Sequence, residues 1–232
     1  QDTVELTKHW KVLGGVRFDK FRVEGNNFRP VDFNVWSYRT GLMYQPRENH
    51  IYYASYGTSF NPTTEGYTAN PATSEVPPEK NRNIEIGAKW DLADGDVSLR
   101  TSIFRSEKTN ERNTDLPTNP GASGAVTLSG ARHTDGIEIE AAGRITPNWE
   151  VFGSAAWFRA EIDKVGINAN ASTQDTLGKR PGNTPTHAFS LWTTYKLGGG
   201  WKIGGGLESI SDRTPADNYV NIAPAYTRFD AL

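Results

Sequence analysis

The side chains of this sequence that could do catalytic chemistry are scattered along the chain. It has four histidines, without the spacing of a metal site: His9, His50, His133 and His187. His133 and Asp135 are two residues apart and could share one face of a strand, but no third residue completes a hydrolytic site with them. We therefore predict no catalytic residues, no metal site and no enzyme.

Composition narrows the class of protein further. The 232 residues carry a formal net charge of -2, so the chain lacks the basic surface of a nucleic-acid-binding protein. Mean hydropathy is low, at -0.62, and no stretch approaches the roughly 20 apolar residues of a membrane-spanning helix. Aromatic residues nevertheless reach 11%. If the chain lies in a membrane, it must therefore cross it as a β-barrel.

Short and long connections alternate along the chain. The short turns fall at residues 7–9, 47–50, 93–96, 146–148 and 198–200. The long polar segments, rich in Asn, Pro, Thr, Gly and Ser, are 26–35, 61–81, 109–133, 164–186 and 212–225. Between them lie strand-like stretches close to the roughly 9–11 residues of a tilted membrane strand. The pattern predicts about eleven antiparallel strands, with short turns at the periplasmic rim and long loops outside.

Alternation within the strands predicts which face meets lipid. Over residues 83–92, Ile84 and Ile86 share one face, while Glu85 and Lys89 share the other. Four further stretches, beginning near residues 12, 97, 137 and 189, keep their mid-strand charges off one face in the same way. A Lys or Arg at the lipid midplane would cost about 2–4 kcal/mol, so we assign the charge-free faces to lipid. The stretch 150–162 is less regular.

Aromatic residues beside the short turns give a second indication. Six of them lie directly after a turn or a few residues before one: Trp10, Tyr44, Trp90, Trp149, Tyr195 and Trp201. Amphipathic rings at one height are typical of a membrane interface. The alternatives are rings that cover hairpin ends in a soluble sheet, or a β-propeller. A propeller blade needs a buried apolar face, which charged mid-strand residues do not provide.

Several segments resemble, in order and spacing, the barrel of TonB-dependent siderophore receptors. The matching residues are Gly14-Gly15-Val16-Arg17-Phe18-Asp19, Tyr53-Ala54-Ser55-Tyr56 with Phe60-Asn61-Pro62, Pro78-Glu79 with Glu85, Gly87 and Lys89, Gly136-Ile137-Glu138-Ile139-Glu140, Gly178-Lys179-Arg180-Pro181 through Pro185, Leu191-Trp192 and Tyr195. Residues 129–136 and 148–156 are similar to the catecholate-receptor branch. The resemblance covers residues 1–232 and implies part of a single barrel of about 22 strands, roughly from the tenth to the twentieth.

The resemblance also implies a function. Such a receptor lies in the bacterial outer membrane and imports ferric siderophores with energy delivered by TonB. Its iron is part of the ligand, not a cofactor. The expected partners are a ferric siderophore, with catecholates favoured, the receptor's own plug domain, TonB, lipid and lipopolysaccharide. This sequence lacks the plug domain, the TonB box and the terminal aromatic strand, so we expect a fragment. The alternatives are an outer-membrane porin and a barrel-embedded enzyme.

A ferric catecholate is anionic and aromatic, and this chemistry points to candidate ligand residues. Arg and Lys provide charge-assisted hydrogen bonds, and rings provide stacking or cation–π contacts. The long segments and one strand end offer Phe28, Arg29, Tyr67, Phe104, Lys108, Arg112 and Arg132. For each of them, a solvated loop charge or a contact with lipopolysaccharide is the alternative. Glu79 is expected to have a structural role at the base of a loop.

Overall fold

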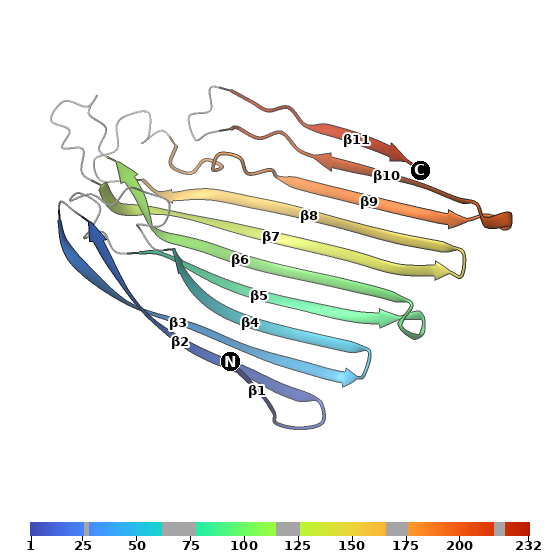
Figure 1. Ribbon diagram of the computed structural model, residues 1–232, viewed down its shortest axis with the longest axis horizontal. Helices are drawn as coiled ribbons and strands as arrows, with labels where there is room; N and C mark the ends of the chain where they lie inside the picture. The colour runs from blue at the N-terminus through green and yellow to red at the C-terminus, as the bar shows by residue number, and fades with distance from the viewer. Residues whose placement is uncertain (26–27, 62–77, 115–125, 166–175, 216–220) are drawn as a thin grey trace.

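A computed structural model describes residues 1–25, 28–61, 78–114, 126–165, 176–215 and 221–232. They form one antiparallel sheet in which each strand pairs with its neighbours in sequence (Figure 1). The eleven strands are β1 (Asp2–Glu5), β2 (Trp10–Gly25), β3 (Phe28–Arg47), β4 (His50–Asn61), β5 (Glu79–Leu92), β6 (Val97–Thr114), β7 (Val126–Thr146), β8 (Trp149–Lys164), β9 (His187–Lys196), β10 (Lys202–Ile210) and β11 (Tyr226–Ala231). In the described ranges, no helix is long and apolar enough to span a membrane. The predicted number of strands is confirmed.

Short turns join the strands at one edge of the sheet, as predicted. Two of them are single 3-10 turns, η1 (Ala93–Gly95) between β5 and β6 and η2 (Gly198–Gly200) between β9 and β10. Gly199 and Gly200 have φ of 73° and 83°, a left-handed conformation that glycine adopts without strain. The strand ends that are separated by longer stretches of sequence lie at the opposite edge (Figure 1). This asymmetry is typical of outer-membrane barrels.

Two segments predicted as loops are partly strand. β3 already begins at Phe28 and pairs with β2 as far as Gly25, so the prediction of a loop over residues 26–35 was wrong. Likewise β6 continues to Thr114 and β7 starts at Val126, inside the predicted loop 109–133. Main-chain pairing does not require apolar side chains, since it satisfies backbone donors and acceptors in any surroundings. The polar composition therefore marks where the strands leave the lipid, not where they end.

The sheet has two chemically different faces. On one, here called the apolar face, large hydrophobic side chains are exposed: Ile86 is 55% exposed, Ile103 53% and Ile137 49%. The other, the polar face, carries Arg17, Arg39, Tyr53, Glu85, Lys89, Arg100, Glu138 and Glu140. Among the described residues only five hydrophobic side chains are buried. The predicted separation of apolar from charged side chains is confirmed, and exposed apolar area on this scale is typical of a surface with a non-aqueous neighbour.

Aromatic rings line the turn edge of the apolar face. The ring centroids of Trp10 and Tyr44 are 4.7 Å apart, those of Tyr44 and Tyr52 6.4 Å, and those of Tyr52 and Trp90 6.0 Å. The indole Nε1 of Trp90 also donates to the Tyr52 hydroxyl, at 3.3 Å. The rings thus form a row across four strands, at the height expected for a membrane interface.

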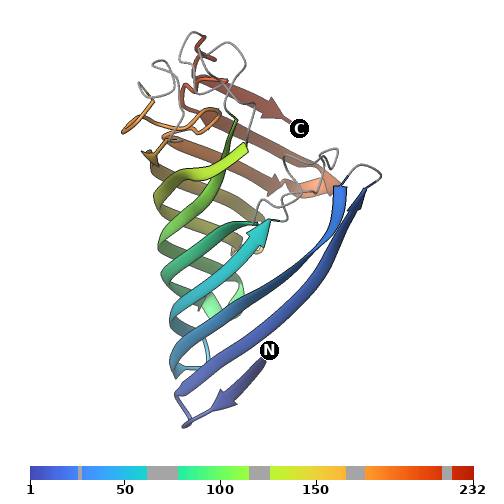
Figure 2. The same cartoon turned by 90° about the vertical axis from the view of Figure 1, so that its left-hand side faces the viewer.

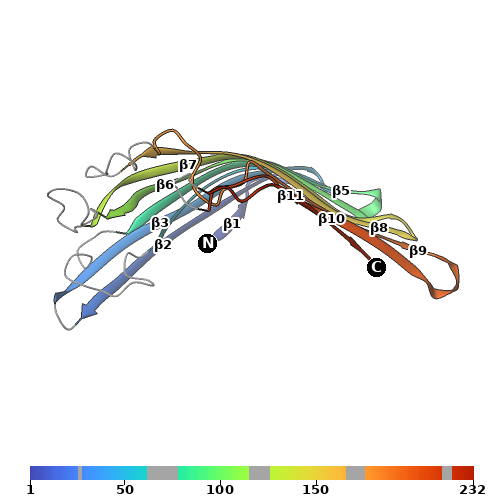
Figure 3. The same ribbon diagram turned by 90° about the horizontal axis from the view of Figure 1, so that it is seen from above.

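The sheet is strongly twisted, and the β2–β3 hairpin leaves it at one end (Figures 2 and 3). β3 pairs with β4 only from Arg39 to Arg47, whereas its pairing with β2 continues to Phe28 at the start of the strand. Phe21 stacks on Phe33 at 5.1 Å and on Phe60 of β4 at 6.0 Å. These rings connect the departing hairpin to the rest of the sheet.

Candidate functional site: a groove on the polar face

A groove of about 920 Å³ lies along the polar face from β3 to β7. Its volume is within the range of sites that hold small ligands. The polar side chains among its lining residues include Arg39, Tyr53, Ser55, Ser59, Asn81, Asn83, Glu85, Lys89, Ser106, Lys108 and Arg132. Basic, hydroxyl and amide groups thus share one concavity with a tyrosine ring, which suits a ligand that is both anionic and aromatic.

Tyr53 of β4 is fixed in the groove by its neighbours on β5. Its hydroxyl donates to the carboxylate of Glu85, and the ammonium of Lys89 lies 5.4 Å from its ring centroid. The ring covers Gly87, which is directly opposite Tyr53 in the strand register. Only a residue without a side chain leaves room for a ring at that position. Tyr53 is therefore held flat against the wall, with Lys89 beside it.

An ion-pair cluster at the loop end of the groove joins two of the predicted ligand residues. The ammonium of Lys108 lies 3.1 Å from Glu79 and 3.5 Å from Glu111. Arg132, opposite Lys108 in the register, reaches Glu111 at 2.7 Å. Glu79 is only 5% exposed and also accepts a hydrogen bond from Asn61, at 3.2 Å. This agrees with the structural role expected for Glu79, and leaves Lys108 and Arg132 in contact with carboxylates.

The other predicted ligand residues are not brought to this cluster. Phe104 lies on the polar face, 6.4 Å from Phe158, with its ring over Gly136. Phe28 and Arg29 open β3, and Arg112 lies near the end of β6, but their side chains are outside the described part of the structure. Tyr67 lies outside the described residues altogether. The structure thus groups Lys108 with Arg132 and separates Phe104 from them.

Sequence reasoning did not select Tyr53 or Glu111 for the site. Both lie in strands, whereas the predicted ligand residues belong to the long polar segments and one strand end. The alternation of side chains along β4 places Tyr53 on the polar face beside Glu85, so the sequence pattern was sufficient to identify it. Nothing in the sequence signals Glu111, because β-bulges after Thr109 change the side chains' alternation there.

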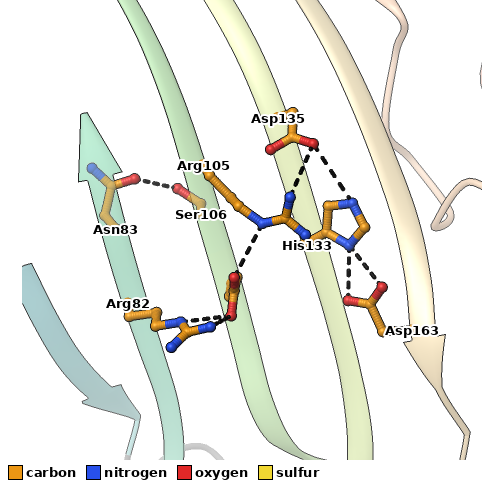
Figure 4. A network of polar contacts seen from close by, with 8 residues as sticks. Arg82, Asn83, Arg105, Ser106, His133, Asp135 and Asp163 are labelled. Carbon is orange, nitrogen blue, oxygen red and sulfur yellow. Dashed lines mark hydrogen bonds and ion pairs between the residues drawn. The ribbon is translucent and has the colours of Figure 1, made fainter. Parts of the chain in front are cut away.

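A second polar network lies on the apolar face, nearer the loop edge than the exposed hydrophobic side chains (Figure 4). The Nδ1 atom of His133 lies 2.7 Å from Asp163, and its Nε2 atom lies 3.7 Å from Asp135. Arg105 connects Asp135, at 3.5 Å, to Glu107, at 3.1 Å. His133 and Asp135 do share a strand face, as the sequence suggested.

This network does not form a hydrolytic site. The hydroxyl of Ser106 donates to Asn83, at 2.6 Å, and not to the histidine (Figure 4). Within the ranges that the structure describes, no group of three or more His, Cys, Asp or Glu could hold a metal ion. The acids and arginines around His133 pair with one another, so the arrangement is that of an ion-pair network between strands.

At the loop edge, the segments before β9 and after β10 are tied together. Arg180 contacts Asp212 at 2.7 Å, and its guanidinium lowers the pKa of that carboxyl. The hydroxyl of Ser211, which is 2% exposed, accepts from the main-chain N–H of Thr186 at 2.8 Å. These contacts order the two segments against each other beside the end of the sheet.

The comparison with protein families gives the class of this sheet. The family model described as "TonB dependent receptor-like, beta-barrel" matches residues 1–232, the whole chain. The chain belongs to the TonB-dependent receptor β-barrel family. Members of this family lie in the outer membrane and are receptors and transporters, not enzymes. The resemblance of the sequence to the barrel of TonB-dependent receptors is confirmed, and its relatives include proteins named as siderophore receptors.

Individual relatives cover the whole chain as well. It is 30% identical to the probable TonB-dependent receptor BfrD of Bordetella pertussis over 261 residues, which are 100% of this chain and 33% of that protein. The catecholate siderophore receptor Fiu of Escherichia coli K12 is 27% identical over 97% of this chain and 33% of its own length. The crystal structure of the siderophore receptor PiuA from Acinetobacter baumannii superposes with a TM-score of 0.85 and 27% identity, covering 99% of this chain and 35% of that one. The chain thus spans about a third of the relatives that it matches.

Proposed function

We propose that this chain forms part of the wall and outer loops of a receptor that imports ferric siderophores across the outer membrane with TonB-derived energy. The match of the barrel family to all 232 residues, on a sheet with one apolar and one polar face, carries this proposal. We further propose that residues 1–232 belong to a single barrel domain of about 22 strands, roughly from the tenth to the twentieth. The plug domain and TonB would be partners of the complete receptor, and lipid and lipopolysaccharide would contact the apolar face.

The ligand that we propose is a ferric catecholate. One relative that matches 100% of the chain is named as a probable siderophore receptor, and one that matches 97% of it as a catecholate siderophore receptor. The groove on the polar face supports this choice, because it combines Lys89 and Arg39 with the ring of Tyr53. Iron would enter as part of the ligand, and the chain would need no cofactor of its own. Phe28, Arg29, Tyr67, Phe104, Lys108, Arg112 and Arg132 remain the proposed ligand residues at the outer end.

Uptake by the full-length receptor tests this function. Cells that depend on it should accumulate radioiron from a ferric catecholate, and deleting the gene or abolishing the proton-motive force should stop accumulation. A porin would instead pass small solutes without an energy supply and conduct ions in planar bilayers without removal of any plug. Energy-independent permeation of unrelated solutes would therefore contradict the proposal.

A double variant tests the outer-end ligand residues. Replacing Arg112 and Arg132 together with Gln should weaken binding of a ferric catecholate by about tenfold or more, because each charge-assisted hydrogen bond contributes about 1.5–3 kcal/mol. Binding is measured by quenching of intrinsic fluorescence in the full-length receptor. Binding of a neutral ferric hydroxamate should not change. Unaltered catecholate binding would show that other residues form the ligand site.

A further inference from the structure

His133 of β7 is a buried histidine with a carboxylate at each ring nitrogen (Figure 4). Its side chain is on the apolar face, yet the residue is only 9% exposed, against 49% for Ile137 on the same face. Its Nδ1 atom lies 2.7 and 2.8 Å from the two carboxylate oxygens of Asp163, and its Nε2 atom lies 3.7 Å from Asp135. The histidine thus connects β7 to the end of β8.

A β-bulge at the end of β8 brings Asp163 to this histidine. Ala131 of β7 pairs with Lys164. The next residue of β7, Arg132, pairs with Ile162, two positions away. Asp163 is therefore the extra residue of the bulge. Because a bulge bends its strand and changes the direction of a side chain, the contact with the histidine is made where β8 departs from regular pairing.

Charged groups of three strands surround His133. Opposite it in the register are Glu107 of β6 and Glu161 of β8. The cations nearby are Arg82 and Arg105, which contact Glu107, Arg159, at 4.0 Å from Glu161, Lys164 at the end of β8 and Lys179 in the segment beside it. Within the described ranges, the ion-pair contacts of the imidazole ring are with carboxylates only, and the arginines contact those carboxylates.

The charge of the imidazole decides how many of these contacts are attractive. The imidazolium carries an N–H on both nitrogens, so it can donate to Asp163 and attract Asp135 at the same time. The neutral ring carries one N–H, and a neutral ring that donates to Asp163 turns the lone pair of Nε2 toward Asp135. Histidine side chains ordinarily change charge between about pH 5 and 8, where aspartates stay ionised. The double contact therefore belongs to mild acid and is lost as the imidazole gives up its proton.

The residue next to Asp163 holds an outer segment against the sheet. The main-chain N–H of Ile162 donates to the Lys179 carbonyl at 3.0 Å, and the N–H of Gly178 donates to the Ile162 carbonyl at 2.9 Å. Ile162 is 5% exposed. A shift of the bulge would disturb both hydrogen bonds. The charge of His133 is thus connected, through one neighbouring residue, to the order of the segment at the loop edge.

We propose that His133 is a proton-sensitive clasp at the outer rim of the wall. In its protonated form it joins Asp163 to Asp135 and fixes the bulged end of β8, and with it residues 176–181, against the sheet. Loss of the proton breaks the contact with Asp135 and loosens the segment. The inference goes beyond the proposed function, because it concerns the order of the rim and requires no particular ligand.

Hydrogen exchange of the full-length receptor tests the clasp. Protection factors, which correct for the intrinsic effect of pH on exchange, are measured over residues 159–164 and 176–180 at about pH 5.5 and about pH 8.5. In the wild type, protection should be about fivefold higher at the acidic pH, because a charge-assisted hydrogen bond is stronger than a neutral one. His133→Gln, which keeps a neutral donor, should remove this difference. His187→Gln is the matched control: it removes a histidine of the same edge whose ring contacts the Thr186 hydroxyl at 3.3 Å, and should keep the difference.

Asp163→Asn gives a second measurement, which decides the matter if His133→Gln fails to assemble. It removes the charge with which the imidazolium pairs, so most of the pH dependence should again disappear. Equal protection at the two pH values in the wild type would overturn the inference, and so would an undiminished pH dependence in either variant. Uptake of ferric siderophores by the wild type tests the proposed function separately, so the two can fail independently.

Discussion

The ring of Tyr53 lies so close over Gly87 on the neighbouring strand that a Cβ atom at Gly87 would fall 2.5 Å from the ring's Cζ and hydroxyl oxygen. Phe104 over Gly136 and Trp192 over Gly206 repeat the arrangement on the same face. In each pair an aromatic ring covers backbone that glycine leaves bare, which is a recognised way of stabilising glycine within a sheet.

Gly87→Ala should therefore destabilise the barrel by about 1–3 kcal/mol, because the new methyl group displaces the Tyr53 ring. Displacement would also break the hydrogen bond to Glu85. The shift in heat-modifiable migration of the full-length receptor measures the effect. Gly57→Ala is the control: its Cβ atom would have no neighbour closer than the Tyr38 carbonyl oxygen at 4.0 Å, so stability should be nearly unchanged. The Gly87→Ala penalty should shrink in a Tyr53→Ala background, and an undiminished penalty there would contradict this explanation.

The two faces of the sheet should respond differently to a new charge. Ile86→Arg places a cation on the exposed apolar face, at a cost of about 2–4 kcal/mol near the bilayer midplane, and should reduce the amount of assembled barrel in the outer membrane. Ser102→Arg, on the polar face of the next strand, should assemble almost normally. Assembly is read from heat-modifiable receptor in isolated outer membranes. Comparable damage from both variants would show that the assignment of faces is wrong.

Labelling should reveal the orientation of the two edges. The sequence given contains no cysteine, so a single new thiol in this part of the receptor reports on its own position. Asn221→Cys, at an exposed position of the loop edge before β11, should react with a membrane-impermeant maleimide in intact cells. Gly198→Cys, at a turn where a Cβ atom meets open space, should react only after the outer membrane is permeabilised. The reverse pattern would invert the orientation.

The contact between Arg180 and Asp212 should depend on acidity. Since the guanidinium lowers the pKa of the Asp212 carboxyl below its ordinary value of 3.8, the contact contributes fully above pH 3.8 and weakens as the pH falls through the lowered pKa. Asp212→Asn should therefore speed amide exchange in residues 179–186 at neutral pH. Once the pH is below the lowered pKa, wild type and variant should converge, with about equal rates. A difference that persists unchanged into strong acid would rule out this ion pair as the cause.

The wall of this protein could be predicted from its sequence far better than its ligand site. Ile84 and Ile86 alternate with Glu85. Such alternation predicts both that the segment is a strand and which side chains share a face, since lipid excludes charge from one side. The extent of β3 could not be predicted, because polar residues near Phe28 fit a loop and a water-exposed strand equally well. Arg39 and Lys108 look alike in sequence. Only the structure shows that Lys108 lies beside the carboxylates of Glu79 and Glu111, whereas Arg39 lies opposite Gly57.

The pairing of every strand with its sequence neighbours also bears on how such receptors diversify. Each long connection at the loop edge closes a single hairpin, so a change in its length alters the closure entropy of that hairpin alone. Doubling a flexible connection costs only about 0.6 kcal/mol, which a wall of many paired strands can absorb. A change in the length of one such connection therefore leaves the pairing order of the strands unaltered. A new cargo can thus be accommodated by exchanging loops, without redesigning the strands that hold the protein in its membrane.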